Sequence, residues 1–116
     1  MEFQEIRVAL KDIRLQGGGA NEEFLAALRT RLKEMEAARQ KVLLVPDCDS
    51  GECPDVDAGL ELTAAFKHCA RRIKDCQCVA GFKLPSVFAG MERGPELSEN
   101  FKAELLEKHP HYVFPD

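Results

Sequence analysis

The sequence predicts a small single domain of the α/β class, spanning residues 1–116, with a mostly parallel or mixed sheet of four to five strands and three main helices. Short segments with the two-residue period of strands alternate with longer segments whose apolar residues recur every three to four positions, as in amphipathic helices. This alternating order favours parallel strands with helix cover. A chain of 116 residues is also long enough to bury one core without disulfides or metals.

The first strand is predicted at residues 3–10. Its apolar side chains alternate with polar ones and so share one face; they are Ile6, Val8 and Leu10. After Lys11 and Asp12 the alternation resumes in shifted phase at Ile13 and Leu15, which predicts either a bulge or a short second strand. A turn with three glycines follows at residues 16–20.

A first amphipathic helix is predicted at residues 21–38, with Asn21 as its N-cap. The next strand is the continuous apolar run at residues 42–45, which Pro46 stops. A run without polar alternation is typical of a central strand that is covered on both faces.

A second helix begins at Asp55 and carries basic side chains at its end, where they suit the helix dipole. These are Lys67, His68, Arg71, Arg72 and Lys74. The remaining predicted elements are a strand at residues 76–82, a helical turn at 85–89, a third helix from Pro95 to about Lys108, and an edge strand at 112–114.

The composition of the chain argues against several classes of function. A net charge of −4 argues against binding to nucleic acid or to an anionic membrane, both of which need a basic face. No apolar run reaches the roughly 20 residues that span a bilayer. The N-terminus lacks the pattern of a secretory signal, and five cysteines cannot all pair internally, so the sequence predicts a cytoplasmic protein with free thiols.

The least ordinary segment is the acidic loop at residues 47–55, Asp-Cys-Asp-Ser-Gly-Glu-Cys-Pro-Asp, which follows the central strand. The spelling Val-Pro-Asp-Cys-Asp-Ser-Gly at residues 45–51 resembles the first motif of haloacid-dehalogenase-type phosphatases, in which two aspartates follow an apolar strand. The resemblance covers seven residues. Here the motif lies on a later strand than in that family, and no second acidic pair follows it.

The resemblance implies a divalent-metal-dependent enzyme that acts on a phosphorylated substrate. Asp47 and Asp49 would supply oxygen ligands to Mg²⁺, with Ser50 or Lys83 orienting the phosphate. The simpler interpretation is that Asp55 caps the second helix and the other acids of the loop are hydrated.

Topology suggests a binding groove at the same place. Open α/β sheets bind ligands at the carboxyl ends of their strands. Lys83 and Ser86 follow the third predicted strand and would meet Asp47 and Asp49 there, together with Ser50. The alternative is a plain ion pair between Lys83 and an acid.

The cysteines offer a third possibility, a metal or redox site. In a parallel sheet, Cys48 and Cys53 lie near carboxyl ends, whereas Cys76 and Cys78 lie near amino ends, about 15 to 20 Å away. This separation disfavours a four-thiol site, and the neighbouring carboxylates should raise the thiol pKa of the loop pair. His109 and His111 flank a proline near the chain end, where exposure to solvent is the expectation.

The leading hypothesis is therefore a binding or regulatory module that contacts a small-molecule ligand or a protein partner through the carboxyl-end groove or an exposed helix face. A second copy of the chain, forming a homo-oligomer, is a further candidate partner. The alternatives are the Mg²⁺-dependent enzyme and the cysteine-based metal or redox site.

Overall fold

The structure is a computed structural model, and it describes residues 3–15 and 17–115. Three strands form a parallel sheet in the order β1-β2-β3: β1 (Gln4–Ala9), β2 (Val42–Asp47) and β3 (Val79–Phe82). The main helices α2 (Glu22–Ala37), α3 (Val56–Arg72) and α4 (Gly94–Lys108) confirm the predicted three. Two short segments, α1 (Leu10–Ile13) and the 3-10 helix η1 (Ser86–Gly90), complete the order.

The α/β class is confirmed, but the prediction of four to five strands is wrong for the described part of the chain, which forms three. Residues 10–13 wind into α1 because Leu10 and Ile13, three positions apart, are both buried on one side of a helical turn. The predicted edge strand at 112–114 makes one isolated bridge, between Val113 and Gly81. Nearby prolines lack the N–H that a longer ladder needs.

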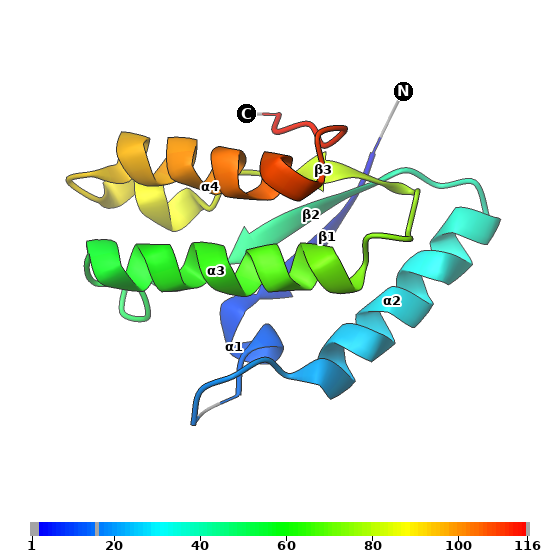
Figure 1. Ribbon diagram of the computed structural model, residues 1–116, viewed down its shortest axis with the longest axis horizontal. Helices are drawn as coiled ribbons and strands as arrows, with labels where there is room; N and C mark the ends of the chain where they lie inside the picture. The colour runs from blue at the N-terminus through cyan, green and yellow to red at the C-terminus, as the bar shows by residue number, and fades with distance from the viewer. Residues whose placement is uncertain (1–2, 16, 116) are drawn as a thin grey trace.

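The helices lie together on one face of the sheet, with α3 between α2 and α4 (Figure 1). The burial of β1 agrees, because Ile6 and Val8 are buried whereas Glu5 and Arg7 are exposed. Strand order follows chain order, and right-handed crossovers then place successive helices on the same side. Helices thus cover one face of the central strand, and Leu43, which alternates to the opposite face, is buried as well, as the apolar run predicts.

Three phenylalanines join the sheet to α3 and α4. The rings of Phe66, Phe82 and Phe101 are fully buried, and each pair of centroids lies 6.2 Å apart. Gly59 lets α3 and α4 approach closely, because a Cβ there would lie 2.8 Å from a methyl carbon of Leu97. The two helices are therefore held side by side along their length.

The helix starts follow the sequence expectation. The Asn21 side chain accepts a hydrogen bond from the backbone N–H of Phe24, and the Asp55 side chain accepts one from that of Ala58. No helix of the described residues is long and apolar enough to cross a membrane.

Candidate functional site

The acidic loop leaves the sheet at the carboxyl end of β2. Asp47 is the last residue of that strand and is exposed, as are Asp49 and Ser50. The loop is folded by its own contacts: the backbone N–H of Glu52 donates to the carbonyl of Asp49, and the N–H of Asp49 donates to a Glu52 carboxylate oxygen 3.2 Å away. The Asp55 side chain is the N-cap of α3, as the simpler interpretation predicted.

Lys83 and Ser86 also lie at the carboxyl edge, but Lys83 is directed elsewhere. Its Nζ lies 2.7 Å from Oε2 of Glu5 on β1, so the ammonium forms a plain ion pair across the sheet. Among the described residues, no ion pair joins Lys83 to Asp47 or Asp49. Ser86 is the exposed first residue of η1.

The carboxyl edge does hold a cleft, of about 440 Å³, between the acidic loop and the segment from η1 to α4. Of the five predicted site residues, Ser50 lines it. The described sheet has no reversal of strand order, which is where open α/β sheets form their ligand crevice. Among described residues, no group of three or more His, Cys, Asp or Glu side chains could hold a metal ion. A Mg²⁺ site formed by the two carboxylates of Asp47 and Asp49 therefore stays a prediction.

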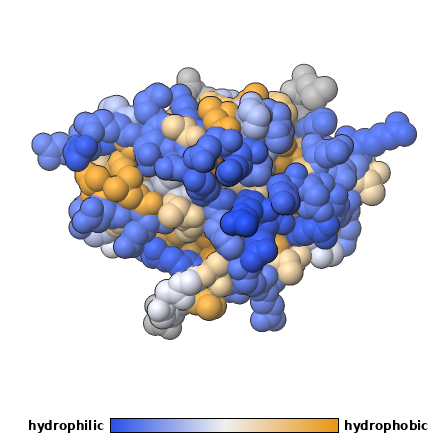
Figure 2. Space-filling model, in the orientation of Figure 1, coloured by the Kyte–Doolittle hydropathy of each residue, from blue (hydrophilic) through white to orange (hydrophobic). Residues whose placement is uncertain are grey.

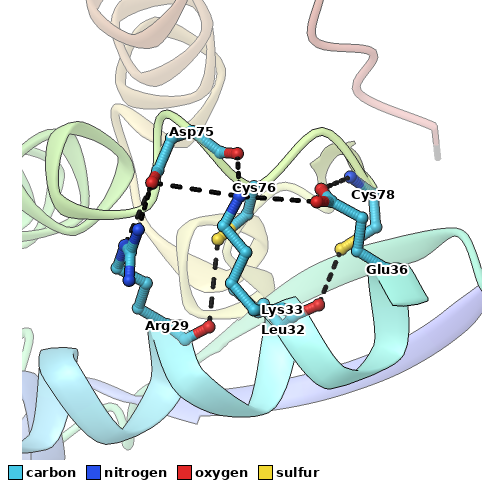
Figure 3. A network of polar contacts seen from close by, with 7 residues as sticks. All are labelled: Arg29, Leu32, Lys33, Glu36, Asp75, Cys76 and Cys78. Carbon is cyan, nitrogen blue, oxygen red and sulfur yellow. Dashed lines mark hydrogen bonds and ion pairs between the residues drawn. The ribbon is translucent and has the colours of Figure 1, made fainter. Parts of the chain in front are cut away.

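Cys48 and Cys53 follow β2 whereas Cys76 and Cys78 precede β3, and because these strands are parallel the two pairs lie at opposite ends of the sheet. Cys76 and Cys78 belong to a network that ties the segment before β3 to α2 (Figure 3). The Cys78 thiol donates to the carbonyl of Leu32 at 3.3 Å, and its backbone N–H donates to Glu36 at 3.1 Å. Arg29 pairs with Asp75 in the same network. These contacts give the two thiols a structural role.

All five thiols are free, and each has a raised pKa. Burial is the largest cause throughout. It raises the pKa of Cys76 to about 11 and that of Cys69 to about 12. For Cys48, burial and then the charge of Glu52 raise the pKa to about 11. Thiolates are thus scarce at neutral pH, which works against the redox alternative.

The structure brings together a basic cleft that the sequence did not predict. It lies between the second half of α3 and the end of α4, has a volume of about 760 Å³, and contains no carboxylate in its lining. Its lining residues are Ala64, Lys67, His68, Arg71, Lys74, Lys108, His109 and His111. The surface over the C-terminal halves of these helices is predominantly hydrophilic in Figure 2. We call this feature the basic cleft.

The segment after α4 positions the histidines of the basic cleft. Val113 is held to β3, since its N–H donates to the carbonyl of Ala80 at 2.9 Å and its carbonyl accepts from the N–H of Phe82 at 3.1 Å. This anchor turns the chain back over the end of α4. His109 is buried, with 5% of its surface exposed, and the expectation that it is solvent-exposed is wrong. His111 is exposed, as expected.

The charges of the basic cleft are only partly neutralised. Lys67 pairs with Glu104 at 2.8 Å and with Glu107 at 3.5 Å, both on α4. Among described residues, Arg71, Lys74 and Lys108 form no ion pair. Burial lowers the pKa of His109, and the charges of His111 and Lys74 lower it further. The cleft therefore gathers positive charge that its own side chains do not neutralise.

Sequence reasoning recognised the basic end of α3 but explained it by the helix dipole. The second half of the cleft comes from residues 108–111, about 40 positions later, and no local pattern links the two. No protein-family model, curated protein or solved structure matches this chain, so a functional assignment rests on the geometry of the chain itself.

Proposed function

We propose that this domain is a binding module whose basic cleft takes a small anionic ligand, most simply one that carries a phosphate group. One observation carries the proposal: a chain of net charge −4 lines a single cleft of about 760 Å³ with four Lys or Arg side chains, three histidines and no carboxylate. This agrees with the sequence-based hypothesis of a binding module that uses an exposed helix face.

The side-chain chemistry supports an oxyanion. The Arg71 guanidinium offers paired N–H donors that match two oxygens of a phosphate, whereas Lys74 and Lys108 act as point charges. Neighbouring positive charges repel one another in the empty cleft, and a bound anion relieves that repulsion. The charge is confined to one cleft of a chain whose net charge is −4, which favours a small ligand over a long polyanion.

The experiment is calorimetric titration of the full chain with inorganic phosphate, at low ionic strength so that screening is small. We expect saturable one-to-one binding. Arg71→Gln should weaken it about ten-fold or more, because hydrogen bonds to charged groups contribute about 1.5–3 kcal/mol each.

Arg31→Gln is the matched control, since Arg31 is exposed on α2, forms no ion pair among described residues and lies outside the cleft lining. Its dissociation constant should equal that of the wild type. Absence of saturable binding, or an equal loss in both variants, would overturn the proposal. Circular dichroism of each variant checks that the fold is retained.

A further inference from the structure

A second cleft lies on the other side of α3, and its lining is mostly small or apolar. It has a volume of about 710 Å³ and lies between α3 and residues 14–15 and 18–20. The apolar and small residues that line it include Ile13, Leu15, Gly19, Ala20, Ala64 and Ala65. Leu15 is 50% exposed there, although it is a large apolar side chain. We call this feature the apolar cleft.

Two glycines without side chains, Gly18 and Gly19, form part of the lining of the apolar cleft. Gly18 and Gly19 have φ angles of 101° and 84°, which residues with a Cβ rarely adopt. At both positions the space where a Cβ would stand is open to 4 Å. The turn is pinned at its base by a bridge between Arg14 and Ala20. The turn therefore has a defined backbone conformation, and the absence of side chains at its glycines leaves space above α3.

The two clefts meet on α3, because Ala64 and His68 line both. Ala64 is exposed and carries only a methyl group, so the outer ridge of α3 is low at that point. His68, the other residue that lines both clefts, is drawn aside by its contact with the Glu22 carboxylate at 2.9 Å. The two clefts therefore adjoin at Ala64 and His68, one with a basic lining and the other with a mostly apolar lining.

From this adjacency we infer that the ligand is a single-chain amphiphile, with its anionic head in the basic cleft and its apolar chain crossing Ala64 into the apolar cleft. The inference rests on the proposed function and names its ligand class. The lining charges set the orientation: the lining of the basic cleft contains no carboxylate, whereas in the apolar cleft the Arg14 guanidinium is already paired with the Glu61 carboxylate at 3.8 Å. Glu22, which also lines the apolar cleft, is held by His68 at 2.9 Å and by Arg72 at 2.9 Å.

The test measures the dissociation constants of a series of alkyl phosphates, from ethyl to octyl, at concentrations below micelle formation. Ethyl phosphate reaches only the basic cleft, whereas octyl phosphate extends across Ala64. Complete burial of a methylene group strengthens binding about four-fold, and a chain in an open groove buries roughly half of its surface. We therefore expect the dissociation constant to fall about two-fold per added methylene group.

The decisive variant is Ala64→Phe, which raises the ridge where the clefts meet. It should remove the chain-length gain, measured as the ratio of the dissociation constants of ethyl and octyl phosphate for the same variant. Ala27→Phe, at an exposed alanine on α2 outside both clefts, is the matched control and should keep the gain. Leu15→Ser provides a second test, since it removes apolar surface from the far end of the groove and should reduce the gain for octyl phosphate alone.

The outcomes separate the two proposals. If ethyl phosphate fails to bind, the proposed function falls. If ethyl phosphate binds but the dissociation constant does not change with chain length, the amphiphile inference alone falls. Octanoate binding as tightly as octyl phosphate would assign the head to a fatty-acid carboxylate, whereas preference for the phosphate would assign it to a phosphate monoester; both support the amphiphile. Binding to anionic vesicles but not to monomeric octyl phosphate would overturn it.

Discussion

The imidazole of His109 stacks on the ring of Tyr112, with centroids 4.8 Å apart and planes 13° apart. The stack holds a buried histidine at the edge of the basic cleft, where it meets the charges of His111 and Lys74. Tyr112 is in turn packed on Phe82 of β3, with centroids 5.6 Å apart. The core of the domain therefore fixes one of the titratable groups that line the basic cleft.

Anion binding should strengthen as pH falls. Burial lowers the pKa of His109 in the free protein, and a bound anion favours the protonated form and raises that pKa. Because the free-protein pKa lies below the ordinary value of 6.5, the affinity should increase as pH decreases from 7 to 5. Sulfate is the probe, since its charge is constant over this range. The other titratable and charged groups near His109 belong to α3, α4 and the C-terminal segment: Lys67, His68, Arg71, Lys74, Glu104, Lys108 and His111.

Titration calorimetry of sulfate at pH 5, 6 and 7 measures this dependence. The variant His109→Gln keeps a polar side chain but cannot protonate, so it should show a shallower dependence than the wild type. An affinity that is constant between pH 5 and 7 in the wild type would contradict a role for His109.

Without an anion, the same histidine should make the fold less stable in mild acid. The pKa of His109 is lowered in the folded state, so its proton binds more readily to the unfolded chain. This contribution lowers the free energy of unfolding as pH falls through the unfolded pKa, near 6.5, toward the lower folded pKa. Urea unfolding between pH 7.5 and 5.5 measures it, and His109→Gln should flatten the slope relative to the wild type.

Gly81→Ala should destabilise the domain and weaken its anion binding. A Cβ at this position would lie 1.8 Å from the carbonyl oxygen of Val113, so the C-terminal segment must move away from β3. We expect a loss of about 1–3 kcal/mol in the free energy of unfolding. Gly51→Ala, where a Cβ meets no atom within 4 Å, is the control and should change stability by less than about 0.5 kcal/mol.

Arg39→Gly should stabilise the domain. Arg39 has a φ of 60° directly after α2, where the N–H of Gln40 donates to the carbonyl of Met35 and closes the helix end. Glycine relieves a left-handed conformation that costs about 1–2 kcal/mol, against about 0.4–1 kcal/mol of added chain entropy. Thermal unfolding should show a net gain, and Gln40→Gly, whose backbone needs no such relief, should show none.

The predicted Mg²⁺ site at Asp47 and Asp49 has a direct test. If the two carboxylates bind the ion, millimolar Mg²⁺ raises the thermal midpoint of the wild type, and the double variant Asp47→Asn, Asp49→Asn removes that rise. Asp57→Asn, at an exposed acid in the first turn of α3, is the control for lost charge. A wild type that does not respond to Mg²⁺ would end this hypothesis.

Much of the secondary structure was predictable because it depends on local chemistry. The starts of α2 and α3 follow from Asn21 and Asp55, whose side chains accept backbone N–H groups within one turn. The prediction failed at Ile13 and Leu15, where a two-residue spacing suggested a strand. There the three-residue spacing of Leu10 and Ile13 prevailed, since it buries both side chains in one helical turn.

The sequence by itself determined the α/β class, the three main helices and the buried central strand, all of which follow from apolar periodicity. Only the tertiary structure decided which polar groups meet. The acidic loop and Lys83 lie at the same edge of the sheet. Lys83 nevertheless pairs with Glu5, because β1 and β3 flank β2 and the Lys83 side chain reaches across that strand. The basic cleft forms because α3 and α4 pack side by side and the bridge at Gly81 returns the C-terminal segment to the sheet. Such contacts join residues far apart along the chain, so no local pattern encodes them.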